Sequence, residues 1–222
     1  YTIYQLQPIA NNATAEKSYA GNIQFNYKKE FGEESSIFIN QAFFVTQITS
    51  PIIAMQDFLG NVYFNNQSKP VLTKGFDTYV QLKVPDWEFY LGYTYTDANR
   101  QYLSPNQFMP YTPRNRVAAT ALYEEEGNFR IGLEASYTGY QYRDDNSKTS
   151  GYLFMAAMAE KKFGPKWSLV LNCENLLNIK QSNYESLYTG PISNPTFKTL
   201  WAPIDGRIIN LSLRFQPFAK EK

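Results

Sequence analysis

The residues that could carry out chemistry are few in this sequence, and their types argue against an enzyme. The 222 residues include no histidine and a single cysteine, Cys173. Histidine is the commonest metal ligand and a frequent general base near neutral pH, so its absence removes most hydrolase and zinc-site chemistry. The sequence also has no serine in a nucleophile-elbow motif and no glycine-rich phosphate loop. We therefore predict no enzymatic activity, no catalytic residue, no cofactor and no metal site.

The adjacent acids Asp144 and Asp145 are the remaining candidate for cation binding, whereas the glutamate run at 124–126 is interpreted as a solvated turn. Hard cations prefer oxygen ligands, but both clusters lie between strand-like segments, where solvated turns are the simpler interpretation. Cys173 falls at an apolar position of such a segment, where we expect it to act as a small hydrophobic residue. The net charge of +1 gives no basis for nucleic-acid binding.

Aromatic side chains in two long connections are the candidate ligand-binding residues. The connections over 97–113 and 178–205 both contain several prolines. Aromatic rings combined with a few polar groups line most small-molecule sites. The candidates are Tyr102, Phe108, Tyr111, Tyr184, Tyr188, Phe197 and Trp201. The alternative is that both connections are folded lids that do not touch a ligand.

Segments with a period of two must position these connections. In the final segment, 206–218, apolar residues alternate with polar ones such as Ser212, and the segment 87–96 has the strongest alternation in the chain. A period of two indicates a strand with one apolar and one polar face. A final strand of this kind that finishes on aromatics is typical of an outer-membrane β-barrel, with its apolar face toward lipid. The residues that we expect to face lipid include Trp87, Phe89, Leu91, Tyr93, Ile209, Leu211, Leu213 and Phe215.

The whole pattern predicts about nine antiparallel strands. They lie near 19–28, 36–48, 61–84 with an interruption near Pro70, 87–96, 116–123, 129–138, 151–163, 167–174 and 206–218. Two of them have ambiguous faces. In 36–48 either Phe38, Ala42 and Phe44 face lipid or Ile39, Phe43 and Val45 do, and we favour the first set. The faces of 151–163 stay open.

The connections between these strands alternate in length. Those near 31–35, 85–86, 124–128 and 164–166 are short, and those near 51–60, 97–113, 143–150 and 178–205 are longer. Outer-membrane barrels have this asymmetry, with short periplasmic turns and longer outside loops. Aromatic residues make up 17% of the chain, which suits a barrel with two aromatic girdles. No run of about 18 apolar residues is present, which excludes a transmembrane helix.

Four motifs resemble the TonB-dependent outer-membrane receptors, and they occur in the order expected for that family. They are GYTYTDA at 92–98, YTPRNR at 111–116, NCENLLN at 172–178 and WAPIDGR at 201–207. The resemblance implies an all-β, antiparallel transmembrane barrel of 22 strands with a plugged lumen. Residues 1–222 would be its C-terminal part, about nine strands without the plug domain. Residues 1–16 would be an outside loop, 17–218 the strands with their turns and loops, and 219–222 a tail.

The resemblance also implies a location and a function. The receptor would lie in the bacterial outer membrane and import a scarce nutrient complex, such as a siderophore, cobalamin or another chelate or oligomer. Its partners would be outer-membrane lipid, the N-terminal remainder of the receptor with the plug and first strands, and the TonB protein acting through the plug. The alternative is a structural barrel that docks a surface lipoprotein or another outer-membrane complex. Polar residues expected to face the lumen are Lys83, Glu88, Arg116, Arg130, Glu134, Glu174 and Arg214. We expect them to solvate the lumen and contact the plug rather than to form a substrate path.

Overall fold

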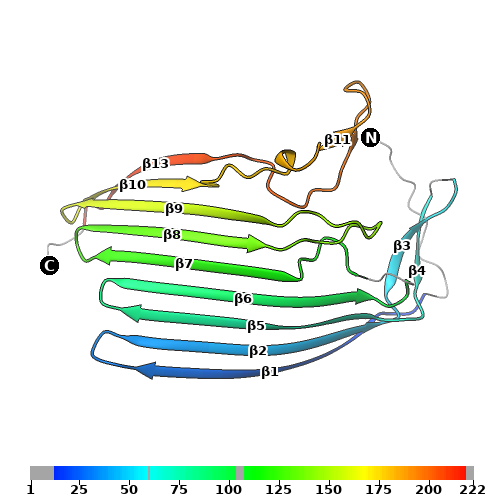
Figure 1. Ribbon diagram of the computed structural model, residues 1–222, viewed down its shortest axis with the longest axis horizontal. Coiled ribbons are helices and arrows are strands. Elements are labelled where there is room, and N and C mark those ends of the chain that lie inside the picture. Colours follow the sequence, from blue (N-terminus) through cyan, green and yellow to red (C-terminus); the bar gives the residue numbers. More distant parts are fainter. Residues whose placement is uncertain (1–12, 60, 104–107, 219–222) are drawn as a thin grey trace.

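The computed structural model describes residues 13–59, 61–103 and 108–218, and its main element is one antiparallel sheet of nine strands (Figure 1). The strands are β1 (Lys17–Glu30), β2 (Ser36–Thr49), β5 (Val71–Val84), β6 (Trp87–Arg100), β7 (Asn115–Glu125), β8 (Phe129–Thr138), β9 (Tyr152–Phe163), β10 (Trp167–Glu174) and β13 (Ile208–Phe215). Each strand pairs with the next one along the chain in this series. The predicted all-β fold and its antiparallel strand order are confirmed. Most of the expected outside loop at 1–16 and the tail at 219–222 lie outside the described residues.

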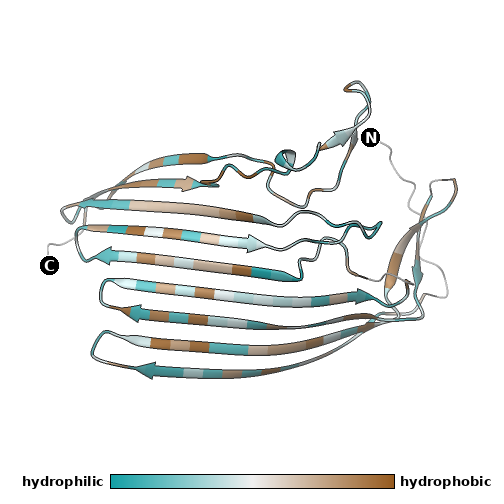
Figure 2. Ribbon diagram, viewed as in Figure 1, coloured by the Kyte–Doolittle hydropathy of each residue, from teal (hydrophilic) through white to brown (hydrophobic). Residues whose placement is uncertain are grey.

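The sheet has one apolar and one polar face because the alternating strands pair in register. Leu91 of β6 lies opposite Val80 and Ala119, while its neighbour Tyr90 lies opposite Gln81 and Thr120. Paired residues share a face, so the apolar residues of neighbouring strands gather on one face and the polar residues on the other. Figure 2 shows the alternation along the strands as bands of hydrophobic and hydrophilic colour. We call these the apolar face and the polar face.

Neither face is covered by a second layer within the described residues. The side chains of Leu91 and Leu211 on the apolar face are 49% and 67% exposed. Among the described residues, the buried hydrophobic side chains are Val71, Ala98 and Trp201 alone, and all of these lie at the long-loop end of the molecule. An apolar surface of this extent needs a non-aqueous neighbour.

The prediction for the faces of β2 is wrong. Phe43 pairs with Ile23 and Phe76, which places it on the apolar face. Ile39 and Val45 are an even number of residues away on the same strand, so they share this face. The favoured set, Phe38, Ala42 and Phe44, therefore lies on the polar face.

The apolar face of β2 includes one amide side chain, Gln41, which shares that face with Phe43. The hydroxyl of Thr78 donates to Gln41 Oε1 at 2.6 Å, and Gln41 Nε2 donates to the backbone oxygen of Asp77 at 3.2 Å. A polar group that is hydrogen-bonded on the sheet avoids most of the cost of an apolar environment.

The faces of β9, which the sequence left open, follow from its pairing. Leu153, Met155 and Ala157 lie opposite Tyr137, Ala135 and Leu133 on the apolar face.

Short turns lie at one end of the sheet and long connections at the other (Figure 1, left and right). The short turns cover 31–35, 85–86, 126–128 and 164–166, and the long connections cover 50–70, 101–114, 139–151 and 175–207. The predicted alternation is confirmed. Pro85 and Asp86 form the predicted tight turn, in which Asp86 has a positive φ of 62°, a conformation that aspartate tolerates in turns.

The long-loop end holds structure that the sequence pattern did not predict. The connection after β2 contains a hairpin of β3 (Ile52–Gln56) and β4 (Val62–Asn66), which stands away from the main sheet in Figure 1. The predicted segment 61–84 is therefore two strands of different sheets, β4 and β5, separated by residues 67–70. Strand β6 continues to Arg100, so part of the predicted 97–113 loop is strand. The connection after β10 contains the 3₁₀ helix η1 (Gln181–Asn183) and the short strands β11 (Tyr188–Thr189) and β12 (Thr196–Phe197). Within the described residues, none of the helical structure is long and apolar enough to cross a membrane.

Candidate functional site: the long loops

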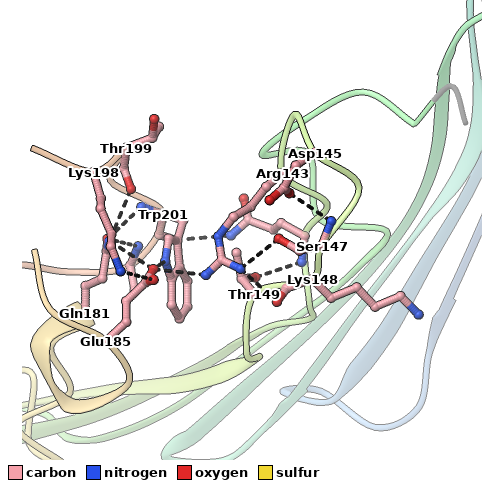
Figure 3. A network of polar contacts seen from close by, with 12 residues as sticks. Arg143, Asp145, Ser147, Lys148, Thr149, Gln181, Glu185, Lys198, Thr199 and Trp201 are labelled. Atoms are coloured by element: carbon pink, nitrogen blue, oxygen red, sulfur yellow. Dashed lines mark hydrogen bonds and ion pairs between the residues drawn. The ribbon is translucent and has the colours of Figure 1, made fainter. Parts of the chain in front are cut away.

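One carboxylate joins two of the long loops. Glu185, in the loop between β10 and β13, accepts hydrogen bonds from Arg143 Nη2 at 3.0 Å and from Lys198 Nζ at 3.1 Å. It also accepts one from the indole Nε1 of Trp201. Arg143 belongs to the loop between β8 and β9, so the contact crosses between loops (Figure 3). We call Glu185, Arg143, Lys198 and Trp201 the Glu185 cluster.

The pKa of Glu185 follows from these neighbours. Burial raises the pKa of its carboxyl, but the hydrogen bonds from Trp201, Lys198 and Arg143 together outweigh burial and hold the pKa below its ordinary value. The carboxylate is therefore ionised near neutral pH, and the cluster is fully formed there.

Gln181 forms the centre of the loop between β10 and β13. Its side chain is fully buried. Its Oε1 accepts the backbone N–H of Trp201 at 2.8 Å, and its Nε2 donates to the backbone oxygen of Thr199 at 3.1 Å. Its own backbone N–H donates to the oxygen of Pro203 at 2.7 Å. One residue thus holds the chain 18 to 22 positions further along through its side-chain amide and its backbone N–H. Nothing in the sequence pattern distinguishes it from an exposed loop glutamine.

Two asparagines fix the base of the same loop. Asn175, which is 2% exposed, accepts from the backbone N–H of Ile179 at 2.8 Å and donates to the backbone oxygens of Ile179 and Asp205 at 2.7 and 3.0 Å. Asn178 Oδ1 accepts the N–H of Arg207 at 3.1 Å. Both asparagines have positive φ, 49° and 54°, a conformation that asparagine tolerates better than most residues.

The motif residues therefore have a physical role at this base. A Cβ at Gly206 would lie 2.6 Å from Asn178 Oδ1, so the glycine leaves room for the loop closure. The NCENLLN and WAPIDGR motifs contain the two halves of one junction, which begins and ends the loop over 175–207.

A second cluster joins the β6–β7 loop to the β8–β9 loop. The ring of Phe108 stacks on Tyr142, with centroids 4.1 Å apart and planes 13° apart. The guanidinium of Arg114 lies 5.3 Å from the Phe108 centroid and donates to Asp97 Oδ1 at 3.1 Å. Lys148 Nζ lies 5.4 Å from the Tyr142 centroid on the same stack.

The predicted ligand-binding aromatics fall into three groups. Phe108 belongs to the stack just described, and the N–H of Tyr111 donates to the oxygen of Tyr142 at 2.9 Å. Tyr184 lies beside Trp201, with ring centroids 5.5 Å apart.

The third group is the tip of the loop after β10. Tyr188 and Phe197 face each other across β11 and β12 with centroids 6.5 Å apart. Among the described residues, no ring contact joins these groups to each other. Tyr102 lies apart from them, half-buried, and burial raises the pKa of its phenol.

These aromatics differ in how accessible they are to a ligand. Trp201 is only 7% exposed and is hydrogen-bonded to Gln141, Gln181 and Glu185 of the long loops, whereas Phe197 is 75% exposed. The structure thus gives Trp201 a positioning role within the loop and leaves Tyr184, Tyr188 and Phe197 with free surface.

A cavity of about 370 Å³ lies beneath the loop that enters β13. Phe154, Leu200 and Ile204 form part of its apolar wall, and Glu174 and Asp205 are the acidic residues that line it. Phe154, Glu174 and Ile208 all belong to the polar face at the long-loop end. Sequence reasoning identified Glu174 but missed the cavity, because its wall comes from β9, β10 and a loop.

The predicted lumen residues all lie on the polar face. Lys83 and Glu88 pair across β5 and β6, with Nζ and Oε1 3.1 Å apart. Arg130 and Glu124 pair across β7 and β8 at 2.6 Å. By the same registers Arg116, Glu134, Glu174 and Arg214 share this face. The free thiol of Cys173 lies on the apolar face, opposite Ile209 and Ala157.

Comparison with known proteins identifies the class of this amphipathic sheet. The family model "TonB dependent receptor-like, beta-barrel" matches residues 2–176. The chain belongs to this family, and it is a protein of the bacterial outer membrane. The family and its solved relatives are receptors and transporters rather than enzymes. No curated protein matches the chain in sequence.

Solved structures share the fold at low sequence identity. The ferric-catecholate import receptor Fiu from Escherichia coli K12 is 18% identical with a TM-score of 0.63, over 95% of this chain and 30% of that one. The FrpB iron transporter from Neisseria meningitidis is 15% identical with a TM-score of 0.66, over 96% and 32%. The copper transporter OprC is 14% identical with a TM-score of 0.69, over 92% and 33%. The chain thus spans about a third of the length of these receptors.

Proposed function

We propose that residues 1–222 form the C-terminal part of the barrel of a TonB-dependent receptor, which binds a scarce nutrient complex outside the cell and imports it. The family match over residues 2–176 is the observation that carries this proposal. The nutrient would be a siderophore, cobalamin or another chelate or oligomer. Energy passed through TonB would rearrange the plug. This chain would supply part of the barrel wall, the outside loops between its strands and the closing strand of the barrel.

The apolar face would contact lipid, and the polar face would line the lumen. The exposure of Leu91 and Leu211 supports this, because no protein layer covers them in the described residues. On the polar face, the pairs Lys83–Glu88 and Arg130–Glu124 are satisfied within the wall. Such pairs favour a solvated lumen wall over a dedicated substrate path.

The rest of the receptor would close the barrel at both sides of this sheet. Within the described residues, β1 pairs only with β2, and β13 pairs only with β10. Unpaired backbone groups in lipid cost several kcal/mol each. Strands outside this chain would therefore pair with β1 and β13, and the plug would fill the lumen.

The ligand mouth would use the exposed aromatics and the cavity at the base of the last long loop. Tyr188 and Phe197 offer free aromatic surface at the tip of that loop. The cavity bordered by Phe154 and Asp205 opens on the polar face below it. Gln181 and the Glu185 cluster hold the loop in one shape, which reduces the entropy lost when a ligand binds.

Nutrient uptake with and without TonB tests the proposal. The full-length receptor is expressed in paired cells that have or lack TonB, and uptake of radiolabelled ferric siderophores and cobalamin is measured. The proposal expects uptake only where TonB is present. Equal uptake in both cells would contradict it. Absence of uptake together with co-purification of a surface lipoprotein would instead support a structural scaffold.

Cysteine labelling tests the orientation of the loops. In a Cys173→Ser background of the full-length receptor, Asn183→Cys should react with a membrane-impermeant maleimide added to intact cells. Lys166→Cys, in the turn between β9 and β10, should not react. The reverse result would invert the proposed topology.

A further inference from the structure

A groove on the apolar face lies over β7 near the short-turn end. Its volume is about 370 Å³, and it is lined by Trp87, Ala121, Tyr123, Ile131 and Leu133. All the surface within it is apolar. It belongs neither to the long loops nor to the polar face, so it has no part in the proposed ligand mouth.

Ala121 of β7 forms the floor of this groove. It lies in one cross-strand row with Phe89 of β6 and Leu133 of β8, and the next row toward the short turns is Trp87, Tyr123 and Ile131. Neighbouring strands are about 5 Å apart, so Trp87 on β6 and the wall of Ile131 and Leu133 on β8 stand about 10 Å apart across the small Ala121 side chain. A trough of this width along a strand accommodates a rod-shaped apolar group, such as a lipid acyl chain.

Aromatic rings close the trough toward the short turns. Trp87 and Tyr123 meet edge to face with centroids 5.0 Å apart, and Tyr123 contacts Phe129 at 5.3 Å. Tyrosine and tryptophan favour the level at which acyl chains meet lipid headgroups. The headgroup of a lipid in the trough would therefore lie just beyond Tyr123.

One cross-strand row beyond the trough contains an acid and a base. Glu125, Phe129 and Lys161 lie side by side on β7, β8 and β9. This row is two residues past the row of Tyr123 and Ile131, which corresponds to about 7 Å along the strands. Both charged side chains are exposed. Lys161 Nζ donates one hydrogen bond to Asn128 Oδ1, and an ammonium group has three donors.

We propose that this groove binds one zwitterionic glycerophospholipid with a primary ammonium headgroup. An acyl chain would lie over Ala121, the phosphate would contact the Lys161 ammonium, and the headgroup ammonium would contact the Glu125 carboxylate. An anionic headgroup without an amine places no cation against Glu125, so the pair of opposite charges selects the zwitterion. The inference rests on the proposed contact of the apolar face with lipid and is independent of nutrient import.

The test is a lipid competition on the full-length receptor. Delipidated receptor in detergent is mixed with equal amounts of phosphatidylethanolamine and phosphatidylglycerol that carry identical acyl chains, and bound lipid is counted by native mass spectrometry. The expected result is one retained lipid with about a fivefold preference for phosphatidylethanolamine, the factor given by one exposed ion pair. Nutrient and TonB are absent, so a failed uptake experiment and a failed lipid experiment are distinguishable.

Three variants divide the site into its parts. Ala121→Phe fills the trough and should remove most of the retained lipid of both kinds. Lys161→Gln should weaken both lipids about equally, because both carry a phosphate. Glu125→Gln, a conservative change at an exposed position, should keep lipid binding and abolish the preference between headgroups.

Matched controls lie on the same face outside the groove. Lys29 of β1 lies on the apolar face at the short-turn end, opposite Ile37. Ala157 of β9 lies opposite Leu133 on the same face but does not line the groove. Lys29→Gln and Ala157→Phe should behave as the unaltered receptor. Equal retention of the two lipids by the unaltered receptor would overturn the proposal. Retention by Ala121→Phe equal to that of Ala157→Phe would also overturn it.

Discussion

The nine-stranded sheet and the long loop between β10 and β13 are held together by different means. In the sheet, every strand is fixed by backbone pairing, and the side chains mainly divide between two faces. In the loop, single polar side chains do the fixing: Gln181, Asn175 and Glu185 reach residues far along the chain. The sheet therefore tolerates many sequences that keep the alternation, whereas the loop depends on individual residues.

In a water-soluble protein, apolar side chains are buried and polar side chains are exposed. The sheet and the loop show the reverse. Among the described residues, the fully buried side chain is a loop glutamine, Gln181, while leucines in the strands are exposed. Buried polar groups are stable only when their hydrogen bonds are complete. We expect a change in the loop to act through lost hydrogen bonds, and a change in the sheet to act through the environment of a face.

The largest expected effect is a charge on the apolar face. Leu211→Arg in β13 should lower the free energy of unfolding of the full-length receptor by roughly 2–4 kcal/mol if position 211 lies near mid-membrane. Urea unfolding of the receptor in lipid vesicles measures it. The adjacent change Ser212→Arg on the polar face should have little effect. Equal losses for the two variants would contradict the assignment of the faces.

A buried amide in the loop should have a smaller effect on global unfolding, because its loss acts on the local opening of the loop. Gln181→Leu leaves the N–H of Trp201 and the oxygen of Thr199 without their partner, at about 1–3 kcal/mol per unsatisfied group. Hydrogen exchange should become faster over 178–205 and stay unchanged in β6. Asn194→Leu, at an exposed position of the same loop, is the control. Faster exchange in β6 as well would show that loop and sheet unfold together.

The smallest expected effect is the pH dependence of the Glu185 cluster. Because the folded pKa of Glu185 is lowered, its stabilising contribution is complete above the unfolded pKa of about 4.3 and is lost as the pH falls through the folded pKa. Exchange of the amides around Trp201 should therefore accelerate below about pH 4. Glu185→Gln should exchange faster at pH 7 and lack this acid step. An identical acid step in the variant would assign it to another group.

The sheet could be predicted from the sequence because the period of two survives in almost every strand. The failure at β2 shows where that reasoning ends. Both parities of β2 contain an amide, Asn40 or Gln41, so the pattern alone cannot choose between them. The choice depends on Thr78 and Ile23, which belong to neighbouring strands.

The loops could be predicted only as connections. The positions of Gln181 and Glu185 become meaningful when Arg143, Thr199 and Trp201 are seen beside them, and these partners come from separate parts of the chain. The NCENLLN motif was recognisable by resemblance, but its role at the loop base depends on the backbone of Asp205. Long-range polar contacts leave no periodic trace in a sequence.

The central claim is that the apolar face of this sheet contacts lipid and the polar face contacts an aqueous lumen. Spin labels placed one at a time at positions 89 to 94 of β6, in a Cys173→Ser full-length receptor in lipid vesicles, test it most directly. We predict that labels at Phe89, Leu91 and Tyr93 collide mainly with oxygen, which partitions into lipid. Labels at Tyr90, Gly92 and Thr94 should collide mainly with a water-soluble nickel complex. An inverted pattern, or equal protection of all the labels from both reagents, would contradict the account.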